Sequence, residues 1–243
     1  MRLSFATAMR IAMLLAGAPA ADALAGGFSV SPIGLSLDSR DASASVRVLN
    51  TSDETIVVQS KALKWSQAQG RDSTVETREL LVNPPIFRLA PGEEQLVRVA
   101  PRNSTRGPIE DAYRLLIREV PPKEEPASGR GAFRIAVAHN MPVYIRPPTP
   151  DPNPAANWRA ERTAEGVRLI GENGGTSRYR IQDVEFSVGD ARLQRTFLVV
   201  LAQSRLELDL ALRPDPASRS LQIRAQDEAG RPVSIDVPLE ERP

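Results

Sequence analysis

Short runs in which apolar and polar residues alternate recur along most of the chain and predict β-strands. Val46 and Val48 alternate with polar neighbours, and similar runs occupy 95–100 and 113–120. A period of two places the apolar side chains of a strand on one face. Turn residues, such as the predicted hairpin tip at 69–72, separate the runs by about 8–12 positions, a spacing typical of a β-sandwich. No helical period is sustained, and we therefore expect an all-β fold.

A proline-rich segment divides the chain into two halves. Five prolines fall among the nine residues from Arg146 to Pro154. Proline has no N–H group to donate to a sheet, and such segments are extended and semi-rigid. Each half carries strand patterns and has the size of an immunoglobulin-like sandwich, about 100 residues. We expect one such domain at 26–147 and a second at 148–243.

The first 25 residues have the features of an export signal. Arg2 and Arg10 precede or flank an apolar stretch at 11–18, which is shorter than the about 20 residues that span a bilayer. A small-x-small pattern ends at Ala25, and we expect cleavage near that residue. A buried helix or a retained anchor is the alternative interpretation. No second long apolar run follows, so we expect no membrane insertion of the mature protein.

The composition excludes several kinds of site. The chain has no cysteine and one histidine, His139, so disulfides, thiolate metal sites and zinc sites built from several histidines are impossible. We expect neither a metal nor a cofactor. The net charge of +1 gives no reason to expect nucleic acid as a partner. No G-x-S-x-G motif or phosphate-binding glycine loop occurs, and His139 is interpreted as an edge-strand residue, so we do not expect an enzyme.

Several short segments of the first half occur in an order that is found in one protein family. They are FxVxP at 28–32, VLNT at 48–51, NPPIFRLAPG at 83–92, VRV at 97–99, YRL at 113–115, EVPP at 119–122 and VYIRP at 143–147. With this order and spacing, the first half resembles the periplasmic chaperones of chaperone–usher pilus systems. It is most similar to the branch that serves spore-coat-U-type, or archaic, pili. The second half is similar only in its strand pattern.

The resemblance implies a fold, a function and partners. Two immunoglobulin-like domains would form a boomerang, and the first domain would bind pilus subunits whose own sandwich lacks its last strand. The first and last strands of that domain would supply the missing strand, as in donor-strand complementation. The periplasmic chaperone would then deliver the subunit to an outer-membrane usher. An unpaired apolar edge strand promotes aggregation, so self-association of the free protein is also expected.

Three apolar residues of the last strand are the candidate donor residues. Phe133, Ile135 and Val137 lie two positions apart and share one face of a strand. By alternation alone they would form an ordinary strand that packs on its own core. The resemblance favours donation to a subunit, where each buried side chain would contribute roughly 1.5–3 kcal/mol.

The family's anchor for the subunit's terminal carboxylate is absent from this sequence. The two positions that are basic in better-known members correspond here to Gly34 and Pro142. A guanidinium group forms strong charge-assisted hydrogen bonds with a carboxylate. Arg98, Arg114 and Arg118 are therefore the candidate anchors, because they are predicted on strands of the same domain. Solvated surface arginine is the alternative interpretation of each.

Glu119, Arg146 and Asp227 match positions that form an interdomain ionic network in members of the family. A bidentate pair between Arg146 and a carboxylate would fix the angle between the domains. The alternative is that these are three unrelated surface charges, for which a pair contributes about 0–1 kcal/mol.

Two other function classes remain alternatives. A structural pilus subunit or adhesin is usually a single sandwich, which the proline-rich break and the second half disfavour. A secreted sandwich enzyme, such as a carbohydrate hydrolase, would need two placed carboxylates in a cleft. No motif supports such an enzyme.

Overall fold

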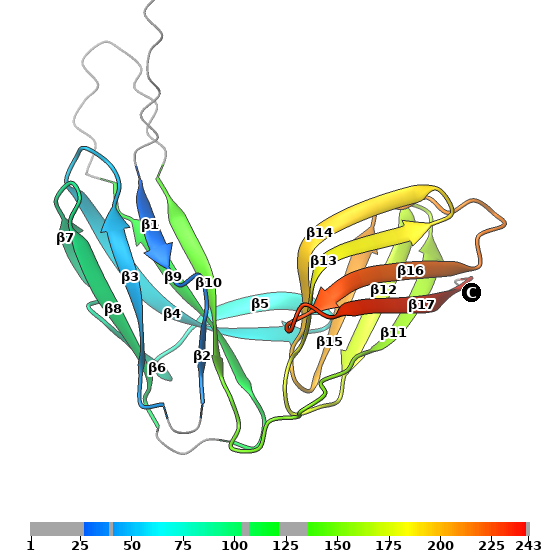
Figure 1. Cartoon of the computed structure of the whole chain (residues 1–243), viewed down its shortest axis with the longest axis horizontal. Helices are drawn as coiled ribbons and strands as arrows, with labels where there is room; N and C mark the ends of the chain where they lie inside the picture. The colour runs from blue at the N-terminus through cyan, green and yellow to red at the C-terminus, as the bar shows by residue number, and fades with distance from the viewer. Residues whose placement is uncertain (1–26, 39–40, 104–106, 122–135, 242–243) are drawn as a thin grey trace, which may run out of the picture.

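A computed structural model describes residues 27–38, 41–103, 107–121 and 136–241, and within these ranges the chain forms seventeen strands and no helix. The strands make two sandwich lobes that diverge from a narrow connection, so the molecule has the shape of a boomerang (Figure 1). In the described ranges, no helix is long and apolar enough to cross a bilayer. The prediction of an all-β protein with two sandwiches is confirmed.

The first lobe consists of two sheets. One sheet contains β1 (Phe28–Ser31), β3 (Ala44–Asn50), β8 (Glu94–Pro101) and β6 (Leu80–Asn83), in that spatial order. The other sheet contains β2 (Leu35–Leu37), β10 (Ala138–Ile145), β9 (Asp111–Glu119), β4 (Ile56–Ala68) and β5 (Arg71–Glu76), and β7 (Ile86–Leu89) pairs with the beginning of β4. The core between the sheets contains the alternating apolar residues, among them Val46, Val48, Val97, Val99, Leu115, Ile117 and Val143.

The N-terminal segment changes from one sheet to the other. β1 pairs antiparallel with β3, whereas β2 pairs parallel with β10 at Val143–Ile145. The crossing brings Gly34 against β10, because a Cβ at Gly34 would lie 3.2 Å from the ring Cγ of Pro142. As a result, in the described part of the chain no strand pairs with the outer edge of β1 or with the outer edge of β10 before Val143.

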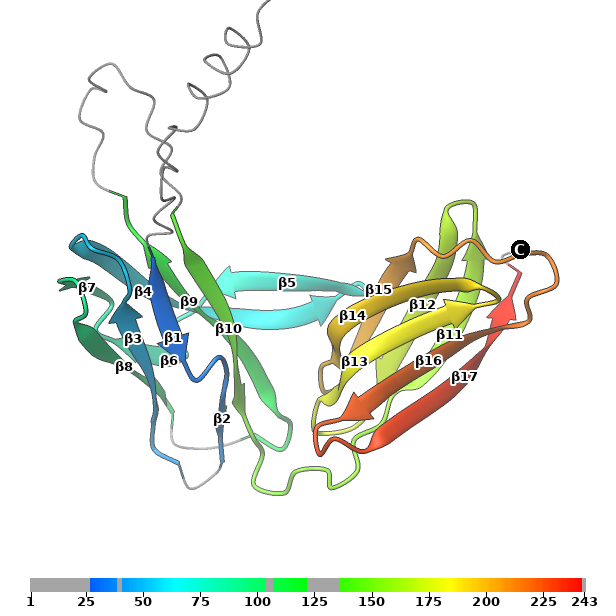
Figure 2. The ribbon, with the colours of Figure 1, turned by 45° about the horizontal axis from the view of Figure 1, so that its top comes forward.

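The second lobe is a sheet that closes over its own core. Its spatial order is β14 (Ala191–Val200), β13 (Tyr179–Val188), β16 (Ser220–Asp227), β17 (Pro232–Glu240), β11 (Asn157–Thr163), β12 (Gly166–Asn173) and β15 (Ser204–Leu210). A parallel contact between β11 and β17 joins the two layers, which Figure 2 shows facing each other. Leu169, Phe186 and Ile223 are fully buried between the layers. The proline-rich segment between β10 and β11 contains no strand.

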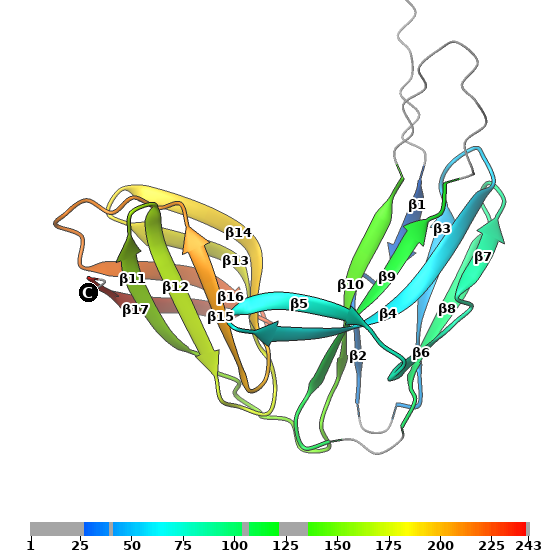
Figure 3. The same cartoon turned by 180° about the vertical axis from the view of Figure 1, so that it is seen from behind.

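A long hairpin extends from the first lobe to the second. The β4–β5 hairpin crosses the space between the lobes, as the view from behind shows (Figure 3). Its tip lies at Gln69 and Gly70, within the turn that the sequence predicts, and both residues have positive φ. The backbone oxygen of Gly70 accepts a hydrogen bond from the N–H of Glu207 in β15 at 2.7 Å. The hairpin tip therefore contacts the edge strand of the second lobe.

Alanine substitutions at two glycines test how tightly this tip packs against the second lobe. Gly70 and Gly92 have similar φ values, 76° and 72°, so alanine causes similar backbone strain at both. A Cβ at Gly70 would lie 2.5 Å from Cγ of Glu207, whereas nothing lies within 4 Å of one at Gly92. We expect Gly70→Ala to lower the free energy of unfolding by about 1 kcal/mol more than Gly92→Ala, because of this added clash. Urea denaturation measures the difference, and equal losses would contradict tight docking.

Candidate functional site

The unpaired edges of β1 and β10 lie at the end of the first lobe that points away from the connection (Figure 1). Met141, Val143 and Ile145 of β10 are buried in the core of the first lobe. Val137 lies on the same face by alternation and is half-buried against that core. The inward face of β10 thus continues towards the open end as an apolar face with one polar member, His139.

Of the three candidate donor residues, only Val137 falls within the described part of the chain. Its carbonyl oxygen accepts a hydrogen bond from the N–H of Glu119 at 3.0 Å, which extends the ladder between β9 and β10 by one position. Phe133 and Ile135 lie outside the described residues. Their assignment as donor residues stays a prediction.

The three candidate anchors are not brought together. Arg98 is exposed on β8 in the other sheet, with its neighbours Val97 and Val99 in the core. Arg118 is exposed near the end of β9, where its Nε and Nη2 donate to Oε1 of Gln59 at 3.0 and 2.9 Å. These side chains therefore occupy separate surfaces.

Arg114 lies beside the position where the family's anchor is missing. Its cross-strand partner is Pro142, which contacts Gly34. The guanidinium group is half-buried and stacks on the ring of Trp65, with 3.7 Å between the guanidinium carbon and the ring centroid. Burial lowers the pKa of Arg114, and the charge of Asp72 partly opposes that effect. Arg114 is thus a partly desolvated cation close to the connection between the lobes.

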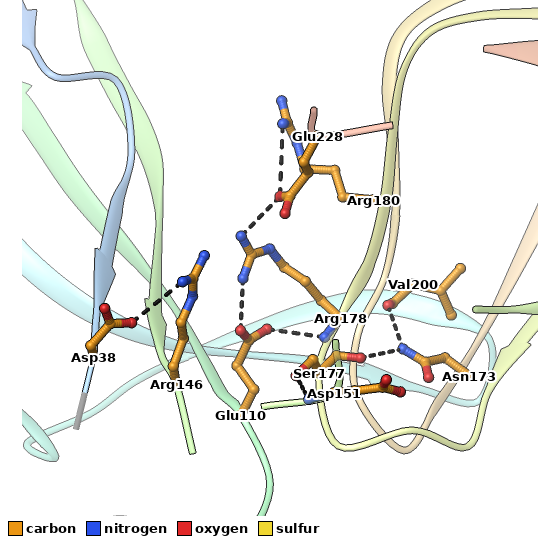
Figure 4. Close-up of polar contacts among 10 residues, drawn as sticks. All are labelled: Asp38, Glu110, Arg146, Asp151, Asn173, Ser177, Arg178, Arg180, Val200 and Glu228. Atoms are coloured by element: carbon orange, nitrogen blue, oxygen red, sulfur yellow. Dashed lines mark hydrogen bonds and ion pairs between the residues drawn. The ribbon is translucent and has the colours of Figure 1, made fainter. Parts of the chain in front are cut away.

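A buried ion pair joins the two lobes (Figure 4). Arg178, which directly precedes β13, donates from Nη1 to Oε2 of Glu110 at 2.7 Å, and the two side chains are only 7% and 2% exposed. Its backbone N–H also donates to Glu110, and its Nη2 donates to Glu228 at 2.9 Å. The guanidinium group lies 3.8 Å from the ring centroid of Tyr144 in β10. Burial raises the pKa of Glu110, and the adjacent Arg178 opposes that rise.

Apolar and amide contacts complete the connection. Tyr144 joins Trp65 and Ala112 of the first lobe in a buried cluster with Val199 and Leu201 of the second.

The amide of Gln67 in β4 forms two buried hydrogen bonds across the same boundary. Its Nε2 donates to the carbonyl oxygen of Val199 at 2.9 Å, and its Oε1 accepts from the N–H of Leu201 at 2.8 Å. Because unpaired buried amides are costly, these bonds favour one relative position of the lobes.

Glu119, Arg146 and Asp227 do not form a network with one another in the structure. Glu119 lies beside Val137, whereas Arg146 follows the far end of the eight-residue β10, a separation of roughly 25–30 Å at about 3.4 Å per residue. Arg146 is paired with Asp38 at 3.4 Å, and Asp227 with Arg231 at 2.6 Å within one turn. Because of the directions of their strands, the three residues lie in different parts of the molecule and do not contact one another.

The residues that do bridge the lobes were missed by sequence reasoning. Glu110 and Arg178 are 68 positions apart, and no local pattern distinguishes either from a surface charge. Glu228 is adjacent to Asp227, so the resemblance pointed to the correct segment of the second lobe but to the wrong carboxylate.

Comparisons with known proteins agree with this architecture. The family described as pili and flagellar-assembly chaperone, PapD N-terminal domain, matches residues 27–150. The chaperone protein LpfB of Salmonella typhimurium is 25% identical over 174 residues, which are 70% of this chain and 69% of LpfB.

Solved structures show the same fold at low sequence identity. A chain of the CsuC–CsuE chaperone–tip adhesion subunit pre-assembly complex, from the archaic Csu pili of Acinetobacter baumannii, is 20% identical with a TM-score of 0.65. The match covers 89% of this chain and all of that one. A chain from the Salmonella enterica SafA pilin in complex with the SafB chaperone is 18% identical with a TM-score of 0.60, and the match covers 87% and 96% of the two chains.

The ion pair between the lobes can be tested by removing its charges. Arg178→Met leaves Glu110 buried without its partner, and we expect a loss of about 3–5 kcal/mol in the free energy of unfolding. The double variant Arg178→Met/Glu110→Leu removes both charges and should recover most of that loss. Urea denaturation provides the measurement.

An exposed pair supplies the matched control. Arg159 and Glu172 are paired at 3.0 Å but are 52% and 44% exposed, so Arg159→Met should cost less than about 1 kcal/mol. Similar losses for Arg159→Met and Arg178→Met would contradict a special contribution of the buried pair.

Proposed function

We propose that this chain, which belongs to the family of pili and flagellar-assembly chaperones, binds incomplete pilus subunits and completes them with its own strands. The observation that carries the proposal is that, among the described residues, no strand pairs with the outer edges of β1 and early β10, which lie beside an apolar face at the open end of the first lobe. An edge strand offers a row of free N–H and C=O groups to an added strand. Every second residue of the donated strand supplies an apolar side chain to the subunit.

Phe133, Ile135 and Val137 are the proposed donor residues of this site. In the free protein, Val137 packs against the core of the first lobe at its open end, so donation would require this side chain to leave that contact for the subunit. The protein would act in the periplasm after removal of residues 1–25, and it would pass its subunit to an outer-membrane usher. Binding of this kind needs neither a nucleotide nor a metal.

Arg114 is the proposed anchor for the subunit's terminal carboxylate. It is the cross-strand neighbour of Pro142, and its guanidinium group stacks on Trp65, where the charge of Asp72 acts on it. A partly desolvated cation gains more from a carboxylate than a fully solvated one does. Arg98 lies on the other sheet, and Arg118 lies on the same face of β9 as Arg114 but four positions farther from the connection; both are exposed, which makes them weaker candidates.

Substitutions at and directly before the start of β10 test the donor face. Val137→Asp and Ile135→Asp place a charge on the proposed face, whereas Ala138→Asp places the same charge on the exposed opposite face. We expect the first two variants to lose co-purification from the periplasm with the subunit encoded beside this gene, because a buried carboxylate is unfavourable. Ala138→Asp should retain it.

The co-purification needs a folding control. Circular dichroism of each purified variant shows whether it remains folded. Equal recovery of the subunit with folded Ile135→Asp and Ala138→Asp would contradict donation through this face.

The anchor is tested separately. Arg114→Gln removes the charge, and we expect binding of the same subunit to weaken roughly tenfold to a hundredfold, the value of one charge-assisted hydrogen bond. Arg98→Gln is the matched control and should bind as the wild type does. Isothermal titration with the purified subunit measures both, and an unchanged affinity of Arg114→Gln would remove Arg114 as the anchor.

A further inference from the structure

His139 is the polar member of an otherwise apolar face. Alternation along β10 places it on the inward face with Val137 and Met141. Its ring packs edge-to-face against Phe28 of β1, with 5.0 Å between the ring centroids and 66° between the planes. Its Nε2 lies 3.2 Å from the carbonyl oxygen of Phe28, which can only accept, so the Nε2–H donates. The side chain thus joins two strands that belong to different sheets.

The carbonyl group of Phe28 belongs to the unpaired edge of β1. The oxygen of the preceding residue, Gly27, accepts a hydrogen bond from the N–H of Thr51 at 3.1 Å and therefore points towards β3. Successive carbonyl groups of a strand point in opposite directions, so the oxygen of Phe28 points away from β3. A strand added to this edge would need that oxygen as an acceptor, and His139 already occupies it.

A second contact closes the same opening. A Cβ built on Gly27 would lie 3.1 Å from Cγ2 of Val137, so β1 begins in close contact with the donor face. Phe28 itself is 5% exposed and belongs to the core of the first lobe. In the free protein, β1 and β10 are therefore held together by side chains where no backbone ladder joins them.

We infer that His139 is a latch that holds β1 to β10 in the free protein and must release Phe28 before a subunit strand can pair with these edges. This inference rests on the proposed function and names a control on its binding step. Breaking one hydrogen bond and one aromatic contact of ordinary size would slow capture of the subunit roughly tenfold to a hundredfold. Without the subunit, the same contacts protect β1 from opening.

Two substitutions separate the two parts of the latch. His139→Phe keeps an aromatic ring but loses the hydrogen bond, and His139→Ala loses both. In hydrogen exchange of the free, full-length mature protein, we expect exchange in β1 to rise severalfold in His139→Phe and further in His139→Ala. Exchange in β16 of the second lobe should not change, which shows that the variants remain folded. Unchanged exchange in β1 would overturn the inference.

The second arm measures capture. The probe is the subunit encoded beside this gene, unfolded in urea and diluted into each variant. We expect the folded His139→Phe protein to capture it roughly tenfold faster than the wild type does, and an equal rate would overturn the inference. If the wild type captures no subunit, the proposed function fails, while exchange in β1 still decides whether His139 holds the two strands together.

A disulfide provides a variant that closes the opening covalently. The chain has no cysteine, and a Cβ at Gly27 would lie 4.0 Å from Cβ of Val137, within the usual range of about 3.5–4.5 Å for a disulfide. We expect oxidised Gly27→Cys/Val137→Cys to capture the subunit at least tenfold more slowly than its reduced form. Equal capture by both forms would show that β1 and β10 need not separate.

Discussion

Backbone N–H and C=O groups need hydrogen-bond partners, and this structure depends on that constraint. A complete sandwich pairs its strands, but here the N-terminal segment leaves one sheet after β1 and joins the other at β2. The crossing leaves the edges of β1 and early β10 without a strand partner in the described part of the chain. Through those edges the first lobe can accept an added strand. In the free protein, side chains cover the gap between β1 and β10.

The connection between the lobes holds the second lobe in a fixed position relative to that site. An exposed ion pair could not do this, because it contributes little and is easily screened. The pair of Arg178 and Glu110 is buried, and it is supported by the stacking of Arg178 on Tyr144 and by the amide of Gln67. Because breaking one of these contacts would leave a buried polar group unpaired, the lobes are held as one unit.

The position of the family's anchor carries no charge in this chain, and a different basic residue lies beside it. Gly34 lies beside Pro142, so the two positions that are basic in better-known members of the family are adjacent here but carry no charge. Arg114 is directly opposite Pro142 on the next strand, and its guanidinium group rests on Trp65 of the long hairpin. The hairpin thus serves both the connection between the lobes and the placement of this cation.

The sequence by itself determined the all-β class and several of the strands, the inward face of β10, the tip of the long hairpin and the strand-free proline-rich segment between the lobes. Each of these depends on a local property, namely a period of two, a turn or a lack of N–H donors. Only the tertiary structure decided which charges meet. Glu119 was expected at the connection, but the direction of β9 carries it to the opposite end and places Glu110 there instead. An ion pair between residues 68 positions apart has no period and no local signal, because it depends on how two separately folded lobes face each other.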